Sequence, residues 1–139
     1  MLQGEYRHTM DAKGRFFFPA PMKEDISERP TVCRGIGSYL WVFSEKDWKT
    51  FTDKIGALPY TDSVKMRHFF IAKSQEAQID AQGRVVIPQY MREYAGLIKN
   101  IVIVGSLDRV EIWDEAKWNN ETEGIEVPTI MDIMERYSF

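Results

Sequence analysis

Hydrophobic and polar positions follow the same order twice along the chain. Short apolar or alternating runs bounded by Gly, Pro, Asp or Ser are typical of β-strands. These runs predict strands at 4–10, 16–18, 31–34 and 40–43, and again at 73–79, 85–87, 101–104 and 110–113. A short helix is expected behind the proline that ends the second strand of each copy. Its buried positions are Met22 and Ile26 in the first copy and Met91 and Ala95 in the second.

Further helical patterns close each copy and join the two. Ser44 and Asp114 stand where helix N-caps are expected, with Asp47 completing a capping box behind Ser44. The segment 61–73 predicts a connecting helix, in which His68 is packed or lies at an interface. Its positions at helical spacing are Val64, His68 and Ile71. Residues 119–126 are polar and expected to be loose, whereas 129–137 predict an amphipathic terminal helix.

The repetition extends to the residues themselves. The segment 10–24 returns as 79–93 at an offset of 69, with seven of 15 aligned positions identical. A second block follows at an offset of 70 and includes the tryptophans Trp48 and Trp118. Two half-modules of about 50 residues are too small to be stable alone. They predict a pseudo-two-fold α+β protein with an internally duplicated β-barrel and short flanking helices. The expected divisions are 1–60 and 74–118 for the half-modules, 61–73 for the connecting helix and 119–139 for an acidic tail.

Composition and charge narrow the class of protein. The 139 residues carry a net charge of −3, which argues against a protein that binds nucleic acid by bulk charge alone. The distribution is uneven, because residues 119–139 have a net charge of −4 and residues 1–23 a net charge of +2. The single cysteine, Cys33, cannot form an intrachain disulfide and is expected to be a small buried residue. A polar N-terminus and the lack of a long apolar run predict a cytoplasmic protein without a membrane partner.

The repeated motif Asp-x-x-Gly-Arg is the feature with chemical content. The aspartates Asp11 and Asp80 are expected to cap the turns, and the glycine supplies a positive φ. The arginines Arg15 and Arg84 have two readings. A guanidinium presents a planar fork that suits phosphate oxygens and the edge of guanine, or it can pair with the aspartate and lock the turn. Both can hold at once, and pseudo-symmetry is expected to place the two arginines side by side.

This motif, followed by three apolar residues and Pro, resembles the AbrB-type swapped-hairpin DNA-binding family. The two copies, their separation and the paired segments 43–45 and 113–115 resemble the MraZ family in particular, over roughly residues 1–118. The resemblance implies a non-enzymatic, nucleoid-associated transcriptional regulator that represses the division and cell-wall gene cluster through tandem promoter repeats. It also implies a homo-oligomer, in the form of a ring, on double-stranded DNA.

The resemblance places the DNA contacts on the two turns and on nearby basic positions. The expected contact residues are Lys13, Gly14, Arg15, Gln82, Gly83, Arg84, Lys23, Arg92, Arg7 and His8. AbrB-type modules often carry a basic residue three positions before the aspartate, where this chain has His8 and Ala77. Gln82 also replaces Lys13 in the second copy. The two halves are therefore expected to contact DNA unequally, with the N-terminal half the stronger.

Other functions stay open on the residues alone. An oligomeric interaction hub without DNA contact would bury Arg15 and Arg84 in salt bridges. A hydrolase would need Asp11 and Asp80 to face each other as a carboxylate pair. The soft ligands His8, His68 and Cys33 lack the spacing of a zinc site. No catalytic residue, metal, cofactor or small-molecule substrate is expected. The acidic tail is interpreted as a solvated face, with screening of the basic turns as a second possibility.

Overall fold

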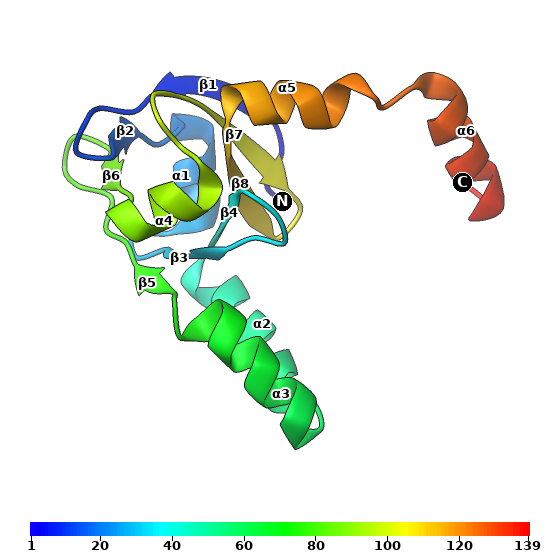
Figure 1. Cartoon of the computed structure of the whole chain (residues 1–139), viewed down its shortest axis with the longest axis horizontal. Helices are drawn as coiled ribbons and strands as arrows, with labels where there is room; N and C mark the ends of the chain where they lie inside the picture. Colours follow the sequence, from blue (N-terminus) through cyan, green and yellow to red (C-terminus); the bar gives the residue numbers. More distant parts are fainter.

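The computed structural model describes residues 1–139, and its eight strands pair antiparallel in two sheets (Figure 1). The six-stranded sheet has the order β1-β7-β8-β4-β3-β5, and the other two strands, β2 and β6, form a separate ribbon. The first-half strands are β1 (Glu5–Thr9), β2 (Arg15–Phe17), β3 (Thr31–Arg34) and β4 (Leu40–Phe43). The second-half strands are β5 (Gln75–Glu76), β6 (Arg84–Val86), β7 (Asn100–Ser106) and β8 (Arg109–Asp114).

The strand order shows the duplication in space. Exchanging each strand for its repeat partner turns the order of the large sheet into its own reverse. The first strand of each half pairs with a strand of the other half: β1 pairs with β7, and β5 pairs with β3. The ribbon is symmetric in the same way, with Phe16 opposite Val85 at its centre. The two halves therefore interlock through exchanged strands.

The α+β class and the duplication are confirmed, but the closed barrel is not formed. The large sheet is open, because its end strands β1 and β5 do not pair with each other. The short β5, with only two residues, offers too few backbone groups to close the sheet. Behind β5 the pairing with β3 extends by one hydrogen bond, from the Ala77 N–H to the Pro30 carbonyl oxygen at 2.8 Å.

One core joins the ribbon, two short helices and the inner face of the large sheet. Helices α1 (Ala20–Ile26) and α4 (Gln89–Ala95) begin behind Pro19 and Pro88, as the sequence predicts. Their predicted buried faces are confirmed, with no position more than 2% exposed. The inner face of the ribbon contributes Phe16 and Val85, which are 2% and 3% exposed. One face of the ribbon is thus packed on the core, and its other face points to solvent.

A helical arm covers the opposite face of β3 and β4 (Figure 1). It consists of α2 (Glu45–Gly56), α3 (Tyr60–Met66) and the π-helical turn η1 (Arg67–Ile71). The connecting helix is therefore confirmed, with its last turn widened. The arm and the sheet share a second hydrophobic core, which contains Cys33, Trp41, Phe43, Ile55 and Phe70. His68 is exposed rather than packed, because η1 turns Phe69 and Phe70 toward the sheet.

The N-caps differ between the halves. The Ser44 hydroxyl oxygen accepts from the Asp47 N–H at 3.1 Å and donates to the Asp47 carboxylate. Asp114 precedes its helix at the equivalent position, but its side chain makes no capping hydrogen bond. The predicted capping role of the side chain is thus confirmed at Ser44 and wrong at Asp114.

The C-terminal segment leaves the body as two helices (Figure 1). Helix α5 (Glu115–Glu123) covers most of the stretch predicted to be loose. It is held by Trp118 against Trp113, with ring centroids 5.6 Å apart, so its polar residues can face solvent. The predicted amphipathic helix is present as α6 (Val127–Arg136), and none of its residues is buried. No helix in the chain combines the length and the apolar character needed to cross a bilayer.

Candidate nucleic-acid interface

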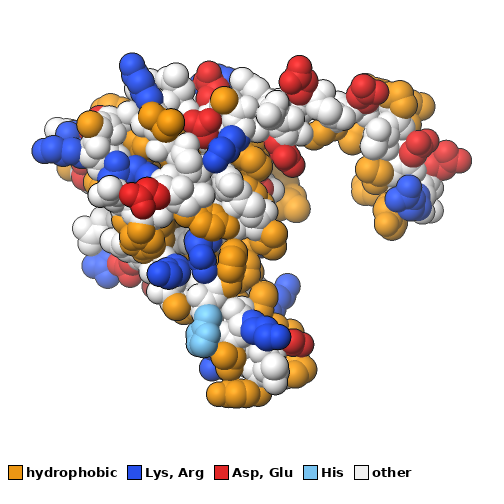
Figure 2. Space-filling view, in the orientation of Figure 1, with side chains coloured by type: hydrophobic (Ala, Val, Ile, Leu, Met, Phe, Trp, Pro, Cys, Tyr) orange, Lys and Arg blue, Asp and Glu red, His pale blue; other side chains and the backbone are white.

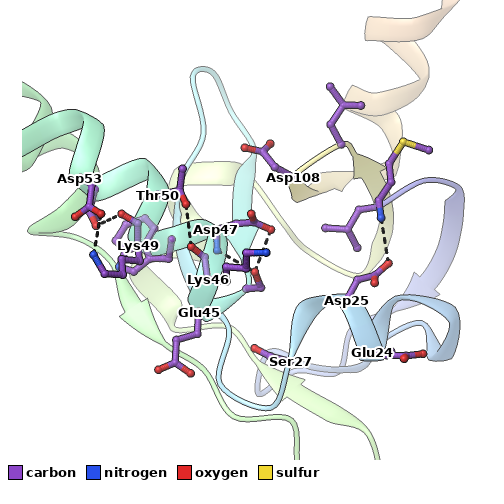
Figure 3. Close-up of a pocket in the computed structure, with 16 residues that line it drawn as sticks. Glu24, Asp25, Ser27, Glu45, Lys46, Asp47, Lys49, Thr50, Asp53 and Asp108 are labelled. Atoms are coloured by element: carbon purple, nitrogen blue, oxygen red, sulfur yellow. Dashed lines mark hydrogen bonds and ion pairs between the residues drawn. The ribbon is translucent and has the colours of Figure 1, made fainter.

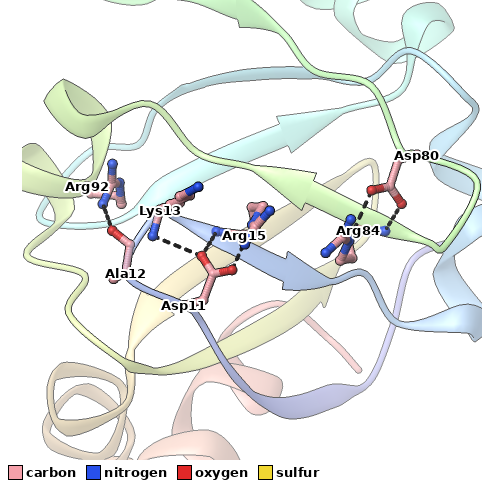
Figure 4. Close-up of polar contacts among 7 residues, drawn as sticks. All are labelled: Asp11, Ala12, Lys13, Arg15, Asp80, Arg84 and Arg92. Atoms are coloured by element: carbon pink, nitrogen blue, oxygen red, sulfur yellow. Dashed lines mark hydrogen bonds and ion pairs between the residues drawn. The ribbon is translucent and has the colours of Figure 1, made fainter.

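The first Asp-x-x-Gly-Arg turn is organised around the carboxylate of Asp11 (Figure 4). Its Oδ1 accepts from the backbone N–H groups of Lys13 and Arg15, both at 2.9 Å. Its Oδ2 accepts from Arg15 Nε at 2.7 Å. The Gly14 N–H closes the turn on the Asp11 carbonyl oxygen at 3.0 Å. The aspartate therefore fixes both the backbone of the turn and the direction of the guanidinium.

The second turn repeats this arrangement around Asp80. Its carboxylate accepts from the N–H groups of Gln82 and Arg84 at 2.9 and 2.8 Å, and from Arg84 Nε at 3.1 Å. The hydrogen bond from the backbone N–H of the arginine is the main cause that lowers the pKa of both Asp11 and Asp80. Both groups are therefore ionised carboxylates at neutral pH. Their predicted turn-capping role is what the hydrogen bonds show.

Both arginines project from the outer face of the ribbon, and they are staggered rather than side by side. Arg15 lies opposite Val86, and Arg84 lies opposite Phe17. The arginines thus occupy one diagonal, where positions on an antiparallel pair are about 7–8 Å apart. Within the chain only the Nε of each guanidinium is hydrogen-bonded. The terminal nitrogens of both remain free to bind a ligand.

The two turns are coupled through the backbone of the ribbon. The Gly14 carbonyl oxygen accepts from the Ile87 N–H, and the Gly83 carbonyl oxygen accepts from the Phe18 N–H, both at 2.9 Å. Gly14 and Gly83 have φ values of +81° and +83°, a conformation that L side chains rarely adopt. Each turn is therefore hydrogen-bonded to the end of the other strand of the ribbon, and these bonds fix the two arginines relative to each other.

The basic residues behind the prolines cross over to the opposite turn. Arg92, from the second half, donates from Nε to the Ile87 carbonyl oxygen at 3.0 Å and from Nη1 to the Ala12 carbonyl oxygen at 3.4 Å. Lys23, from the first half, lies beside Gly83 and is exposed with no hydrogen bond. Arg92 is thus a brace for the first turn, whereas Lys23 is a free cation beside the second. Lys13 and Gln82 are exposed on the turns themselves.

Two of the expected contact residues lie outside this group. Arg7 donates to Asn119 Oδ1 at 3.1 Å and lies 3.7 Å from a carboxylate oxygen of Glu115 on α5. A carboxylate oxygen of Glu5 on the same strand lies 3.5 Å away, so carboxylates on both β1 and α5 oppose the charge of Arg7. His8 is partly buried on β1, and desolvation lowers its pKa, which favours the neutral imidazole. Neither residue adds a free cation to the ribbon.

Sequence analysis missed two residues of this face, Phe17 and Val86. They are 55% and 53% exposed, although they stand next to deeply buried neighbours. Strand alternation could have found them, because the residue after a buried strand position faces the other way. The signal is hidden by the unbroken apolar runs at 16–18 and 85–87, which also fit a strand buried on both faces.

The ribbon does not form a catalytic carboxylate pair. Asp11 and Asp80 precede the two strands of an antiparallel pair, so they lie at its opposite ends (Figure 4). A pair of carboxylates that shares a proton raises one of the two pKa values, whereas here both are lowered.

An interaction hub without DNA contact would require the two arginines to be buried. Their side chains are instead partly exposed, by 37% for Arg15 and 31% for Arg84.

The largest groove lies away from the ribbon, between α1, the N-terminal half of α2 and the β7–β8 turn (Figure 3). Its volume is about 1260 Å³. Six carboxylates line it, accompanied by two lysines and the N-terminal ammonium group: Glu24, Asp25, Glu45, Asp47, Asp53 and Asp108, with Lys46, Lys49 and Met1. A groove of this charge repels nucleic acid. No three His, Cys, Asp or Glu side chains anywhere in the chain are placed to hold a metal ion.

Comparison with known proteins agrees with the duplicated turns. A family model described as "MraZ protein, putative antitoxin-like" matches residues 1–67 and again residues 70–132, so the match reaches beyond residue 118 into the C-terminal helices. The chain is 48% identical over 126 residues to a transcriptional regulator MraZ of Carboxydothermus hydrogenoformans, covering 89% of this chain and 88% of the relative. It is 40% identical over 139 residues to the protein of the same name from Caldicellulosiruptor bescii, covering 97% of each. The Heliobacterium modesticaldum protein of this name is 38% identical over 125 residues, with coverage of 88% and 87%. The chain therefore belongs to the MraZ family, whose named members are transcriptional regulators and not enzymes.

Proposed function

We propose that this chain regulates transcription by binding specific double-stranded DNA with the outer face of the β2–β6 ribbon. The observation that carries the proposal is the pair of outward arginines, Arg15 and Arg84. Each is held at Nε by its own aspartate while its terminal nitrogens are free. Side chains oriented in this way lose less conformational entropy on binding.

The dimensions of the ribbon fit the major groove. That groove is about 12 Å wide and admits a two-stranded β-ribbon. The diagonal of about 7–8 Å between the arginine positions matches two base-pair steps of about 3.4 Å each. A guanidinium fork pairs best with the O6 and N7 atoms of guanine. We therefore expect Arg15 and Arg84 to contact two guanines about two steps apart.

Local charge supports an anionic ligand despite the negative net charge of the chain. Five cations lie on or beside the ribbon together with the two turn aspartates: Lys13, Arg15, Lys23, Arg84 and Arg92. Glu24 and Glu28 share the cleft beside the second turn with Lys23. Further acidic side chains lie along α5 and α6, away from the ribbon (Figure 2), and in the groove between α1 and α2. This separation gives the ribbon a positive field that attracts DNA.

A single ribbon neutralises few phosphates, which gives weak binding at physiological salt. The proposal therefore includes a homo-oligomer, of ring form as the family resemblance implies, that places several ribbons on tandem repeats. Linked sites of this kind gain about 10²–10⁴ in avidity. The unburied apolar residues of α6 support an oligomer, because a ten-residue helix is marginal without a partner. The strand exchange between the halves supports the AbrB-type swapped-hairpin class.

The family resemblance indicates which genes are regulated. We propose repression of the division and cell-wall gene cluster, through repeats upstream of the gene for this chain. Lys13 on the first turn has the neutral Gln82 as its counterpart on the second, so the first turn contacts phosphate more strongly.

The test is fluorescence anisotropy with a labelled duplex from the DNA upstream of this gene, at about 150 mM salt, against a scrambled duplex. Arg15→Lys and Arg84→Lys keep the charge but remove the fork, and each is expected to reduce discrimination about 5- to 150-fold. Arg29→Ala is the matched control, because Arg29 is 66% exposed and pairs only with Glu76. Circular dichroism checks folding. If the folded lysine variants discriminate as the wild type does, the ribbon is not the reading surface.

A further inference from the structure

The outer face of the ribbon has a second diagonal, and it is apolar. Phe17 lies directly opposite Arg84, and Val86 lies directly opposite Arg15. The four side chains therefore form a square, with the two arginines at one pair of corners and the two apolar groups at the other. More than half the surface of each apolar residue is exposed.

The fold does not need these two apolar groups where they are. The core below the ribbon is filled by their neighbours, Phe16 and Val85, which are almost fully buried. A single exposed apolar residue needs no explanation. Here two exposed apolar residues occupy symmetric positions, and each lies beside an arginine with free nitrogens. Together they define a surface that combines positive charge with two apolar side chains.

A ligand of this face must be anionic and must also offer apolar groups at a fixed spacing. The major groove of DNA does so, because thymine projects its C5 methyl group into the groove beside the acceptor atoms of guanine. Side chains directly opposite each other on an antiparallel pair have Cβ atoms about 4.5–5.5 Å apart. That distance corresponds to one or two base-pair steps.

We propose that Phe17 and Val86 read thymine methyl groups, so that the operator carries a thymine within one or two steps of each guanine read by an arginine. This inference rests on the proposed function and adds the apolar half of its specificity. The phenyl ring of Phe17 reaches further than the side chain of Val86. The thymine beside Arg84, which Phe17 faces, is therefore the more strongly selected of the two.

The experiment begins with a random-sequence duplex pool, from which the wild-type protein selects its operator. Each thymine of the selected duplex is then replaced by deoxyuridine, which removes the methyl group and keeps the base pairing. Loss of one buried methyl is expected to weaken wild-type binding about fourfold. Phe17→Ala and Val86→Ala are expected to weaken binding to the thymine duplex and to lose the response to deoxyuridine at one position each. Ile98→Ala, at a site 81% exposed outside the ribbon, is the control and keeps the full response.

The outcomes separate this inference from the proposed function. If the wild type binds both duplexes equally while Arg15→Lys loses discrimination, methyl reading is wrong and the DNA-binding function stands. If Phe17→Ala changes the oligomer size in sedimentation and leaves the deoxyuridine response intact, the apolar face is a contact between copies and the inference fails. If no sequence is enriched from the pool, both proposals fail together.

Discussion

Substitution of Gly14 by alanine tests whether the turn geometry controls both stability and the position of Arg15. At φ +81° an alanine would place its Cβ 2.6 Å from the Ile87 carbonyl oxygen and 2.7 Å from Arg92 Nε. Those two atoms are themselves hydrogen-bonded at 3.0 Å. The new methyl group would therefore enter the contact by which Arg92 braces the first turn, and backbone of the ribbon would have to move.

The expected loss has two parts. An L residue in the left-handed region costs about 1–2 kcal/mol, and disruption of one hydrogen bond adds about 1 kcal/mol. The free energy of unfolding should fall by about 2–3 kcal/mol. For a chain of this length that corresponds to a fall in Tm of about 7–10 °C. Because Arg15 follows Gly14 directly, DNA binding should weaken even at temperatures where the variant is folded.

The assay is thermal unfolding by circular dichroism, followed by anisotropy on folded protein. Gly56→Ala is the matched control, because no atom lies within 4 Å of a Cβ placed there and the residue ends a helix. It should raise the stability by up to about 1 kcal/mol. A Tm for Gly14→Ala within about 2 °C of the wild type would refute the claim that the glycine is required by its backbone conformation.

Three further predictions concern other parts of the molecule. Burial raises the pKa of the Cys33 thiol to about 12, so iodoacetamide should label it at pH 8 only after denaturant unfolds the protein. Since hydrogen bonds from the following arginines lower the pKa of Asp11 and Asp80, their stabilising effect is present above the ordinary pKa of 3.8 and disappears as the pH falls through the lowered value. Acid unfolding of the double asparagine variant should therefore depend less on pH below 4. Truncation after Gly124 should reduce the oligomer size in sedimentation, and it should leave the Tm of dilute, monomeric protein unchanged because no residue of α6 is buried within the chain. Unchanged affinity of the truncated protein for a duplex with a single repeat, on which avidity plays no part, would exclude screening of the turns by α6.

The sequence was sufficient for the features that local chemistry determines. Asp11 and Gly14 predict their turn, because the side chain bonds and the backbone conformation are set within five residues. The sequence was insufficient for features that depend on which strands pair and in which register. The stagger of the two arginines follows from antiparallel register, and the open sheet follows from the short β5. The start of helix α5 behind Asp114 was predicted, but its continuation through 119–123 was not, because its support, Trp113, lies on a strand and not in the helix itself.

The small differences between the halves bear on the kind of DNA site that the proposed function implies. A protein with perfect two-fold symmetry reads palindromes, because its symmetry is mirrored in the operator. Here one end of the ribbon combines Arg15 with Val86 and a turn braced by Arg92, while the other end combines Arg84 with Phe17. The two ends share one backbone geometry but differ in charge and in apolar reach. Under the proposed function, such a ribbon is expected to bind a site better in one orientation than in the other, which is what directly repeated sites require and palindromes do not.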